Sequence, residues 1–114
     1  MMQANDYQKE ALRTAGKKSK NDLILNGVLG LNGEAGEVAD ILKKYLFQGH
    51  ELDTEEMIDE LGDVCWYIAI LAKGLNVELD EVLKHNVEKL RKRYPEGFDA
   101  QKSIYRDEKY AEYR

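Results

Sequence analysis

Two stretches of the chain decide the fold: residues 21–48, NDLILNGVLGLNGEAGEVADILKKYLFQ, and residues 53–74, DTEEMIDELGDVCWYIAILAKG. In each, apolar side chains recur three and four residues apart, which is the pattern of a helix with one buried face. In the first stretch they are Ile24, Val28, Leu31, Ala35, Val38, Leu42 and Tyr45. In the second they are Met57, Leu61, Val64, Ile68 and Leu71. From residue 64 to residue 72 the second helix is apolar nearly all round, which indicates a dimer interface.

Two shorter helices are expected on either side of this pair. Asn5 with Gln8 three residues later resembles a capping box at the start of a first helix. Asp53 with Glu56 resembles a second capping box, at the start of the long stretch 53–74. A last helix is expected over residues 79–94, where Pro95 ends it. The tail beyond it carries four aromatic residues, which we expect to dock on the body or on a neighbouring subunit: Phe98, Tyr105, Tyr110 and Tyr113.

No strand pattern and no linker interrupts the 114 residues. The sequence therefore predicts an all-α fold, a four-helix bundle-like core with a C-terminal tail. We expect a single domain over residues 1–114, because a chain of this length forms one core.

Composition excludes several classes of function. The chain has 17 basic and 22 acidic residues and a net charge of −5, whereas sequence-independent nucleic-acid binding depends on clustered Lys and Arg. The longest apolar run has nine residues, about half of the ~20 that a membrane-spanning helix needs. With no secretory signal apparent and a single cysteine, Cys65, we expect a soluble, cytoplasmic protein without nucleic-acid or membrane partners.

A pair of acids separated by two residues occurs once in each long helix. Glu34 and Glu37 flank Ala35-Gly36, and Glu60 and Asp63 flank Leu61-Gly62. Residues three apart lie on the same side of a helix, about 5–6 Å apart at Cβ. If the helices are antiparallel, as a short connection favours, the two pairs can face each other.

Four converging carboxylates need a counter-ion, because unpaired like charges repel and are costly to desolvate. A ligand set made only of carboxylate oxygens suits Mg²⁺, or Mn²⁺ as a substitute, and not Zn²⁺. Gly36 and Gly62 occupy matching places between the acids, where glycine costs about 1 kcal/mol relative to alanine. Their placement indicates close approach of a neighbouring backbone or a ligand. The alternative is a solvated acidic face with two tolerated glycines.

Positive charge for a phosphorylated substrate is available on the last helix and on the first long helix. Asn86, Lys89 and Arg93 follow one face at spacings of three and four, and Lys44 lies seven residues after Glu37. They are candidates for contacting phosphate oxygens. The alternative is an ordinary solvated face near a helix C-terminus, which favours cations. Trp66 is a candidate for stacking on a base, although core packing is the commoner role of an aromatic at helical spacing.

These residues resemble the MazG-like nucleoside triphosphate pyrophosphohydrolases of the all-α pyrophosphatase superfamily. The likeness runs from about Leu31 to Arg106, within a motif-bearing core of about residues 21–106. It rests on Glu34-x-x-Glu37 and Glu60-x-x-Asp63 with the residues through Tyr67, and on three later segments. Those segments are Asn86-Val87-Glu88-Lys89-Leu90, Arg93-Tyr94-Pro95 with Phe98, and Ser103-Ile104-Tyr105-Arg106.

The resemblance implies a homodimer or a dimer of dimers, with active sites beside the subunit interface and Mg²⁺ held by Glu34, Glu37, Glu60 and Asp63. Asn86 and Lys89, with Arg93, correspond to phosphate-contacting positions. The expected activity is hydrolysis of a nucleoside triphosphate to a monophosphate and pyrophosphate, in clearing the nucleotide pool. Two alternatives stay open: a non-catalytic helical dimerisation module with structural Mg²⁺, and a dedicated dUTP or dCTP pyrophosphatase.

Overall fold

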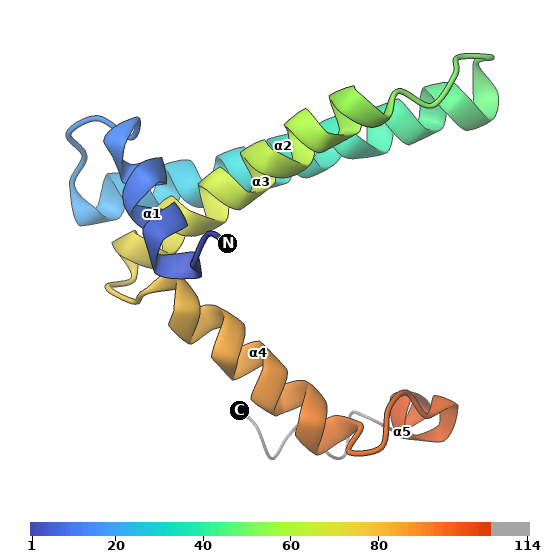
Figure 1. Cartoon of the computed structure of the whole chain (residues 1–114). Coiled ribbons are helices and arrows are strands. Elements are labelled where there is room, and N and C mark those ends of the chain that lie inside the picture. The colour runs from blue at the N-terminus through green and yellow to red at the C-terminus, as the bar shows by residue number, and fades with distance from the viewer. Residues whose placement is uncertain (106–114) are drawn as a thin grey trace. The chain divides into compact units, whose positions relative to one another are not determined.

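The computed structural model describes residues 1–105, which form five helices and no strand (Figure 1). The helices are α1 (Ala4–Arg13), α2 (Lys20–Phe47), α3 (Thr54–Gly74), α4 (Leu79–Arg93) and α5 (Ala100–Ile104). The all-α prediction is confirmed, and the two long helices begin and end within about a residue of the predicted positions. The predictions that concern Arg106, Tyr110 and Tyr113 lie outside the described residues. None of the helices described combines the length and the apolarity that crossing a membrane requires.

The chain divides into two compact units, Met1–Leu79 and a second unit that begins at Asp80. The first unit contains α1, α2 and α3, and the second contains nearly all of α4 together with α5. Each unit is described by itself, and the prediction of one domain over residues 1–114 stays a prediction.

In the first unit, α2 and α3 run side by side as an antiparallel pair (Figure 1). Small residues on both helices let the backbones approach closely. A Cβ atom added at Gly27 would lie 2.7 Å from Leu71 Cβ and 3.1 Å from Leu71 Cα, and one added at Gly30 would overlap the Tyr67 ring. At the end of the pair, Gly74 faces Ile24 in the same way, and a Cβ atom added at Gly74 would lie 2.8 Å from Ile24 Cγ1. We call this line of contacts the glycine seam.

The glycine seam shares only Ile24 with the apolar stripe that the periodicity of α2 predicts. Gly27 and Ile41 are the buried residues of α2, and Val28, Leu42 and Tyr45 of the predicted stripe are exposed in the single chain. The stripe prediction is therefore wrong for these three positions in the single chain. Apolar residues occur on more than one side of α2, and the glycines, which periodicity counts do not register, select the face that contacts α3.

Helix α1 is held on α3 and on the segment that follows it by a buried glutamine. Gln8, only 6% exposed, donates from Nε2 to the carbonyl oxygens of Ala69 and Val77, and its Oε1 accepts from the Leu79 backbone N–H at 2.9 Å. The predicted capping box of Asn5 and Gln8 is thus wrong. The N-cap residue is Gln3, which makes no side-chain cap, because the Gln8 amide is used for contacts with distant segments.

The other predicted cap is confirmed. The Asp53 carboxylate accepts from the Glu56 backbone N–H at 3.0 Å, which satisfies one of the free amides at the start of α3. Ser19 does the same at the start of α2, where its hydroxyl accepts from Asp22 N–H at 3.1 Å.

In the second unit, α4 ends before Pro95, and the short helix α5 follows a turn. The Tyr94 and Phe98 rings lie 5.5 Å apart between centroids across this turn. Asp99 caps α5 by accepting from the backbone N–H groups of Gln101 and Lys102. Phe98 and Tyr105 remain largely exposed within this unit, and their docking on the body or on a neighbouring subunit stays a prediction.

Replacing Gly27 with alanine should destabilise the first unit by about 1–3 kcal/mol, because the new methyl group meets Leu71 backbone that cannot rotate away. The matched control is Gly33→Ala on the same helix, where an added Cβ meets nothing within 4 Å. That variant should be neutral or stabilising by up to about 1 kcal/mol through helix propensity. Urea unfolding followed by circular dichroism measures both, and equal effects of the two substitutions would contradict the close approach at Gly27.

Candidate metal centre

Three carboxylates from α2 and α3 converge beyond the glycine seam. Carboxylate oxygens of Glu34, Glu60 and Asp63 all lie within 4.8 Å of one another. Glu34 and Glu60 are half-buried and Asp63 is exposed. Three of the four predicted acids therefore converge, as the antiparallel arrangement predicts, and we call these three the carboxylate cluster.

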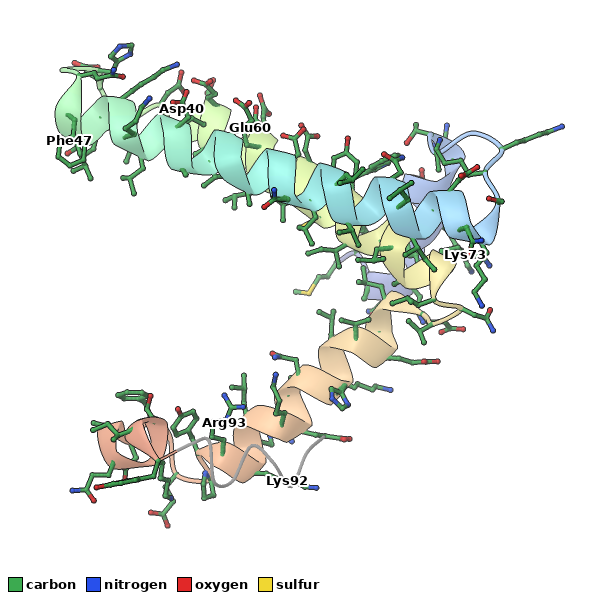
Figure 2. All side chains as sticks on the ribbon, turned by 180° about the vertical axis from the view of Figure 1, so that it is seen from behind. Asp40, Phe47, Glu60, Lys73, Lys92 and Arg93 are labelled. Carbon is green, nitrogen blue, oxygen red and sulfur yellow. The ribbon has the colours of Figure 1, made fainter. Side chains whose placement is uncertain are left out.

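Glu37, the fourth predicted ligand, is not part of the carboxylate cluster. It is exposed one helical turn beyond Glu34, and its charge contributes to raising the pKa of Lys44. Figure 2 shows Asp40, a further turn along α2, on the same side of the helix pair as Glu60. The acidic side of the pair therefore continues past the cluster towards the connection between α2 and α3.

The Glu34 carboxylate lies close enough to Glu60 to affect its ionisation. The hydrogen bond with Glu34 is the largest cause that raises the pKa of Glu60, followed by desolvation and by the negative charges of Glu34 and Asp59. Two carboxylates that share a site resist ionising together. A cation between them removes this repulsion, so the donor set fits a divalent metal ion.

Asp40 shows the opposite balance. It forms ion pairs with Lys43 at 2.9 Å and Lys44 at 3.0 Å. These two hydrogen bonds lower the pKa of Asp40, and the Asp40 carboxylate is the main cause that raises the pKa of Lys44. Asp40 is therefore neutralised within the chain, whereas among the described residues no ion pair involves the carboxylate cluster.

Lys44 also lines an open pocket of about 360 Å³ at the end of the α2–α3 pair. The other lining residues are Ile41, His50, Glu51, Asp53 and Glu56. Glu56 is one helical turn before Glu60, so the pocket begins one turn from the carboxylate cluster. Sequence reasoning missed this pocket because half of its lining, His50, Glu51 and Asp53, comes from the connection between α2 and α3, whose path local patterns do not predict.

Tyr7 of α1 reaches the same turn of α3 that carries Asp63. Its hydroxyl lies 3.5 Å from the Gly62 carbonyl oxygen, at the long end of hydrogen-bonding distance. Burial raises the pKa of the Tyr7 phenol, and the charges of Cys65 and Asp63 raise it further. The phenol therefore keeps its proton at neutral pH and is a hydrogen-bond donor beside the cluster. No sequence signal connects Tyr7 with Gly62, because 55 residues separate them.

Trp66, the candidate for base stacking, is half-buried against α1. Its indole N–H donates to the Ala11 carbonyl oxygen at 3.0 Å and to the Thr14 hydroxyl at 2.8 Å. Its ring meets the Tyr67 ring edge-on, with 5.0 Å between centroids. Of the two roles that the sequence left open, these contacts support packing.

The remaining predicted residues lie on α4, in the second unit. Asn86 is exposed, Lys89 is half-buried and Arg93 is only 8% exposed. Arg93 is therefore the least accessible of the three to a ligand. Their assignment as phosphate-contacting residues stays a prediction.

Gly36 and Gly62 border open space. A Cβ atom added at either would meet nothing within 4 Å. Close approach of a backbone from the first unit is thus not what these two glycines accommodate. The other half of the prediction, approach of a ligand, stays a prediction.

The fold and the site together define a class of protein. It is all-helical, and two of its antiparallel helices present a cluster of carboxylates. Residues 25–98 match the model of the MazG nucleotide pyrophosphohydrolase domain. Because the match covers more than half of the chain and includes all four predicted acids, this chain belongs to the MazG nucleotide pyrophosphohydrolase family.

Two relatives share part of this sequence. The chain is 45% identical over 73 residues to the gene 37 protein of Mycobacterium phage L5, which covers 60% of this chain and 64% of that protein. It is 39% identical over 70 residues to YvdC of Bacillus subtilis (strain 168), covering 54% and 66% respectively. The matches thus span just under two thirds of the length of each relative. No solved structure is similar enough to add to the comparison.

The raised pKa of Glu60 predicts how the stability of the metal-free protein depends on pH. The folded state holds this proton more tightly than the unfolded state, so the free energy of unfolding should fall as pH rises from the ordinary glutamate pKa of about 4.3 through the raised value. Glu60→Gln cannot ionise there. In EDTA, the melting temperature of the unmodified protein minus that of Glu60→Gln should therefore decrease across this window. A melting-temperature difference that is independent of pH would contradict the raised pKa of Glu60.

Proposed function

We propose that this chain is a Mg²⁺-dependent nucleoside triphosphate pyrophosphohydrolase, which converts a triphosphate and water into the monophosphate and pyrophosphate. The convergence of Glu34, Glu60 and Asp63 within 4.8 Å, in a chain of the MazG family, carries this proposal. Clearing the nucleotide pool in the cytoplasm is the role that we infer for it.

The ligand set supports Mg²⁺, with Mn²⁺ as a substitute. All donors of the carboxylate cluster are oxygens, which hard divalent cations prefer, and neither His nor Cys belongs to the cluster. Glu34, Glu60 and Asp63 would hold the ion, and Glu37, one turn further along α2, is kept for the base. When bound, the ion supplies charge neutralisation for the triphosphate and orients it.

The reaction needs a base for the attacking water, and we assign this role to Glu37. Its carboxylate is exposed and lies next to the carboxylate cluster without being part of it. The water oxygen forms a bond to the α-phosphorus while Glu37 takes a proton from the water. The bond between the α-phosphorus and the oxygen that bridges to the β-phosphorus breaks, and pyrophosphate leaves with that oxygen.

Lys44 is the cation of the first unit that we assign to the triphosphate. It lines the pocket that begins one turn from Glu60, and its pKa is raised, so it is fully protonated at neutral pH. A phosphate group must compete with Asp40 for this ammonium. Asn86, Lys89 and Arg93 of α4 are proposed to contact the remaining phosphate oxygens.

We also propose that the chain works as a homodimer or a dimer of dimers. The side of α2 that faces away from the glycine seam exposes large apolar side chains, and others are exposed on α3 and α4. They are Leu25, Val28, Leu29, Leu42, Leu46, Ile58, Leu61, Val82, Leu83, Val87 and Leu90. Apolar surface of this extent is unusual on a soluble monomer and is typical of a subunit interface.

Product analysis tests the proposed reaction. With Mg²⁺ present, a panel of ordinary and oxidised triphosphates should give pyrophosphate and monophosphate, and EDTA should abolish turnover. Glu37→Gln and Asp63→Asn should each lower kcat by at least about 10²-fold, with unchanged helicity in circular dichroism. The control is Glu10→Gln, because Glu10 is paired with Arg13 on α1 and should be dispensable.

The outcomes of this experiment separate the alternatives. Orthophosphate without pyrophosphate would reject the reaction. No turnover with any nucleotide, together with dissociation on chelation, would identify a dimerisation module with structural Mg²⁺. Turnover of dUTP or dCTP alone would identify a dedicated pyrimidine enzyme.

The assembly is tested by introducing charge into the exposed apolar surface. Leu29→Lys should convert the dimer to a monomer, because an ammonium buried in an apolar interface is costly. Met2→Lys is a matched control, since Met2 and Leu29 are both 64% exposed. Light scattering coupled to size-exclusion chromatography measures the mass. A monomeric unmodified protein, or a dimer that tolerates Leu29→Lys, would contradict the assignment of this surface.

A further inference from the structure

One face of α1 contacts the turn of α3 that carries Asp63. Tyr7, Ala11 and Thr14 follow each other at spacings of four and three, so they lie on the same side of α1. Tyr7 meets Gly62, and Ala11 and Thr14 receive the indole N–H of Trp66. Gly62 and Trp66 are also one turn apart, and Asp63 lies between them. This turn therefore contacts α1 through the Gly62 backbone carbonyl at one end and through the Trp66 side chain at the other.

Helix α1 is itself a rigid support for these contacts. The buried Gln8 amide binds Ala69, Val77 and Leu79. At the start of the helix, Asn5 donates to Glu78 at 2.6 Å. The position of the Tyr7 ring relative to α3 is thus fixed by contacts that do not involve the carboxylate cluster. On this face of α1, Tyr7 contacts Gly62. Gly62 directly precedes Asp63, an acid of the carboxylate cluster.

We propose that Tyr7 is a positioning residue for Asp63. The phenol hydroxyl donates to the Gly62 carbonyl, and this contact holds the Glu60–Asp63 turn so that the Asp63 carboxylate stays directed at Glu34 and Glu60. Groups that orient metal-binding side chains without binding the metal commonly change metal affinity by about 10–100-fold when they are removed. This inference rests on the proposed function of the cluster as a metal centre, and it adds α1 to the parts that build it.

Direct measurement of Mn²⁺ binding tests the proposal without any nucleotide. Tyr7→Phe keeps the ring and removes the hydroxyl. In isothermal titration calorimetry, and by the loss of the free Mn²⁺ signal in electron paramagnetic resonance, its Kd should rise about tenfold. The control is Asn5→Ala, which removes a contact of the first turn of the same helix, with Glu78 and not with α3. It should lower the melting temperature and leave the Mn²⁺ Kd unchanged.

Four outcomes are informative. A Kd of Tyr7→Phe equal to that of the unmodified protein overturns the positioning role. So does a rise of the same size in Asn5→Ala, because the hydroxyl would then act only through the general stability of α1. An unmodified protein that binds no Mn²⁺ overturns both this inference and the metal centre. Mn²⁺ binding that depends on Tyr7, in a protein without nucleotide turnover, would reject the proposed function and leave the positioning role standing.

Discussion

The close approach of α2 and α3 along the glycine seam is the constraint on which the rest of the structure depends. Gly27 and Gly30 each weaken α2 by about 1 kcal/mol relative to alanine, yet neither position has room for a Cβ atom. The seam fixes the register of the two helices: Gly74 meets Ile24, Leu71 meets Gly27 and Tyr67 meets Gly30. Continued one turn further, the same register places Glu60 and Asp63 opposite Glu34. A slip of one residue would rotate one acid pair by about 100° and disperse the cluster.

The seam explains how the chain tolerates its repelling carboxylates. The apolar and small residues pack at one end of the helix pair, and the carboxylate cluster lies towards the other end, where solvent reaches it. Water reduces the repulsion between Glu34 and Glu60, and what remains of it contributes to the raised pKa of Glu60. The cluster is therefore an unfavourable arrangement that tight packing elsewhere holds in place. Perturbed carboxylates in such a setting are typical of sites that bind or react.

Much of the fold and part of the site could be predicted from local pattern. Helical spacing and the Asp53 cap predicted the two long helices, and the repeated acid pairs predicted that Glu34, Glu60 and Asp63 converge. The seam itself was missed, because a glycine contributes nothing to a hydrophobic stripe, and α2 has apolar residues on more than one side. The use of Gln8 was mistaken for a local cap, since its partners lie 61 to 71 residues away. Tyr7 was missed for the same reason. Whether α4 contributes to the site depends on its placement relative to α2 and α3, which sequence spacing alone does not predict.

Under the proposed function, the two sides of α2 have different tasks. The seam side sets the register and carries Glu34, while the opposite side presents the exposed Leu25 and Leu29. We call the line of the four acids Asp63, Glu60, Glu34 and Glu37 the acid row. Gly36 has open space around it and directly precedes Glu37, so this end of the acid row is accessible. Helix α1 covers the other end of the row at Tyr7 and leaves Asp63 exposed. A triphosphate therefore has its open approach along the row from Asp63 towards Lys44. Along that line the charge changes from the acids that need a cation to an ammonium that can hold phosphate, which is the order that a metal-bound triphosphate requires.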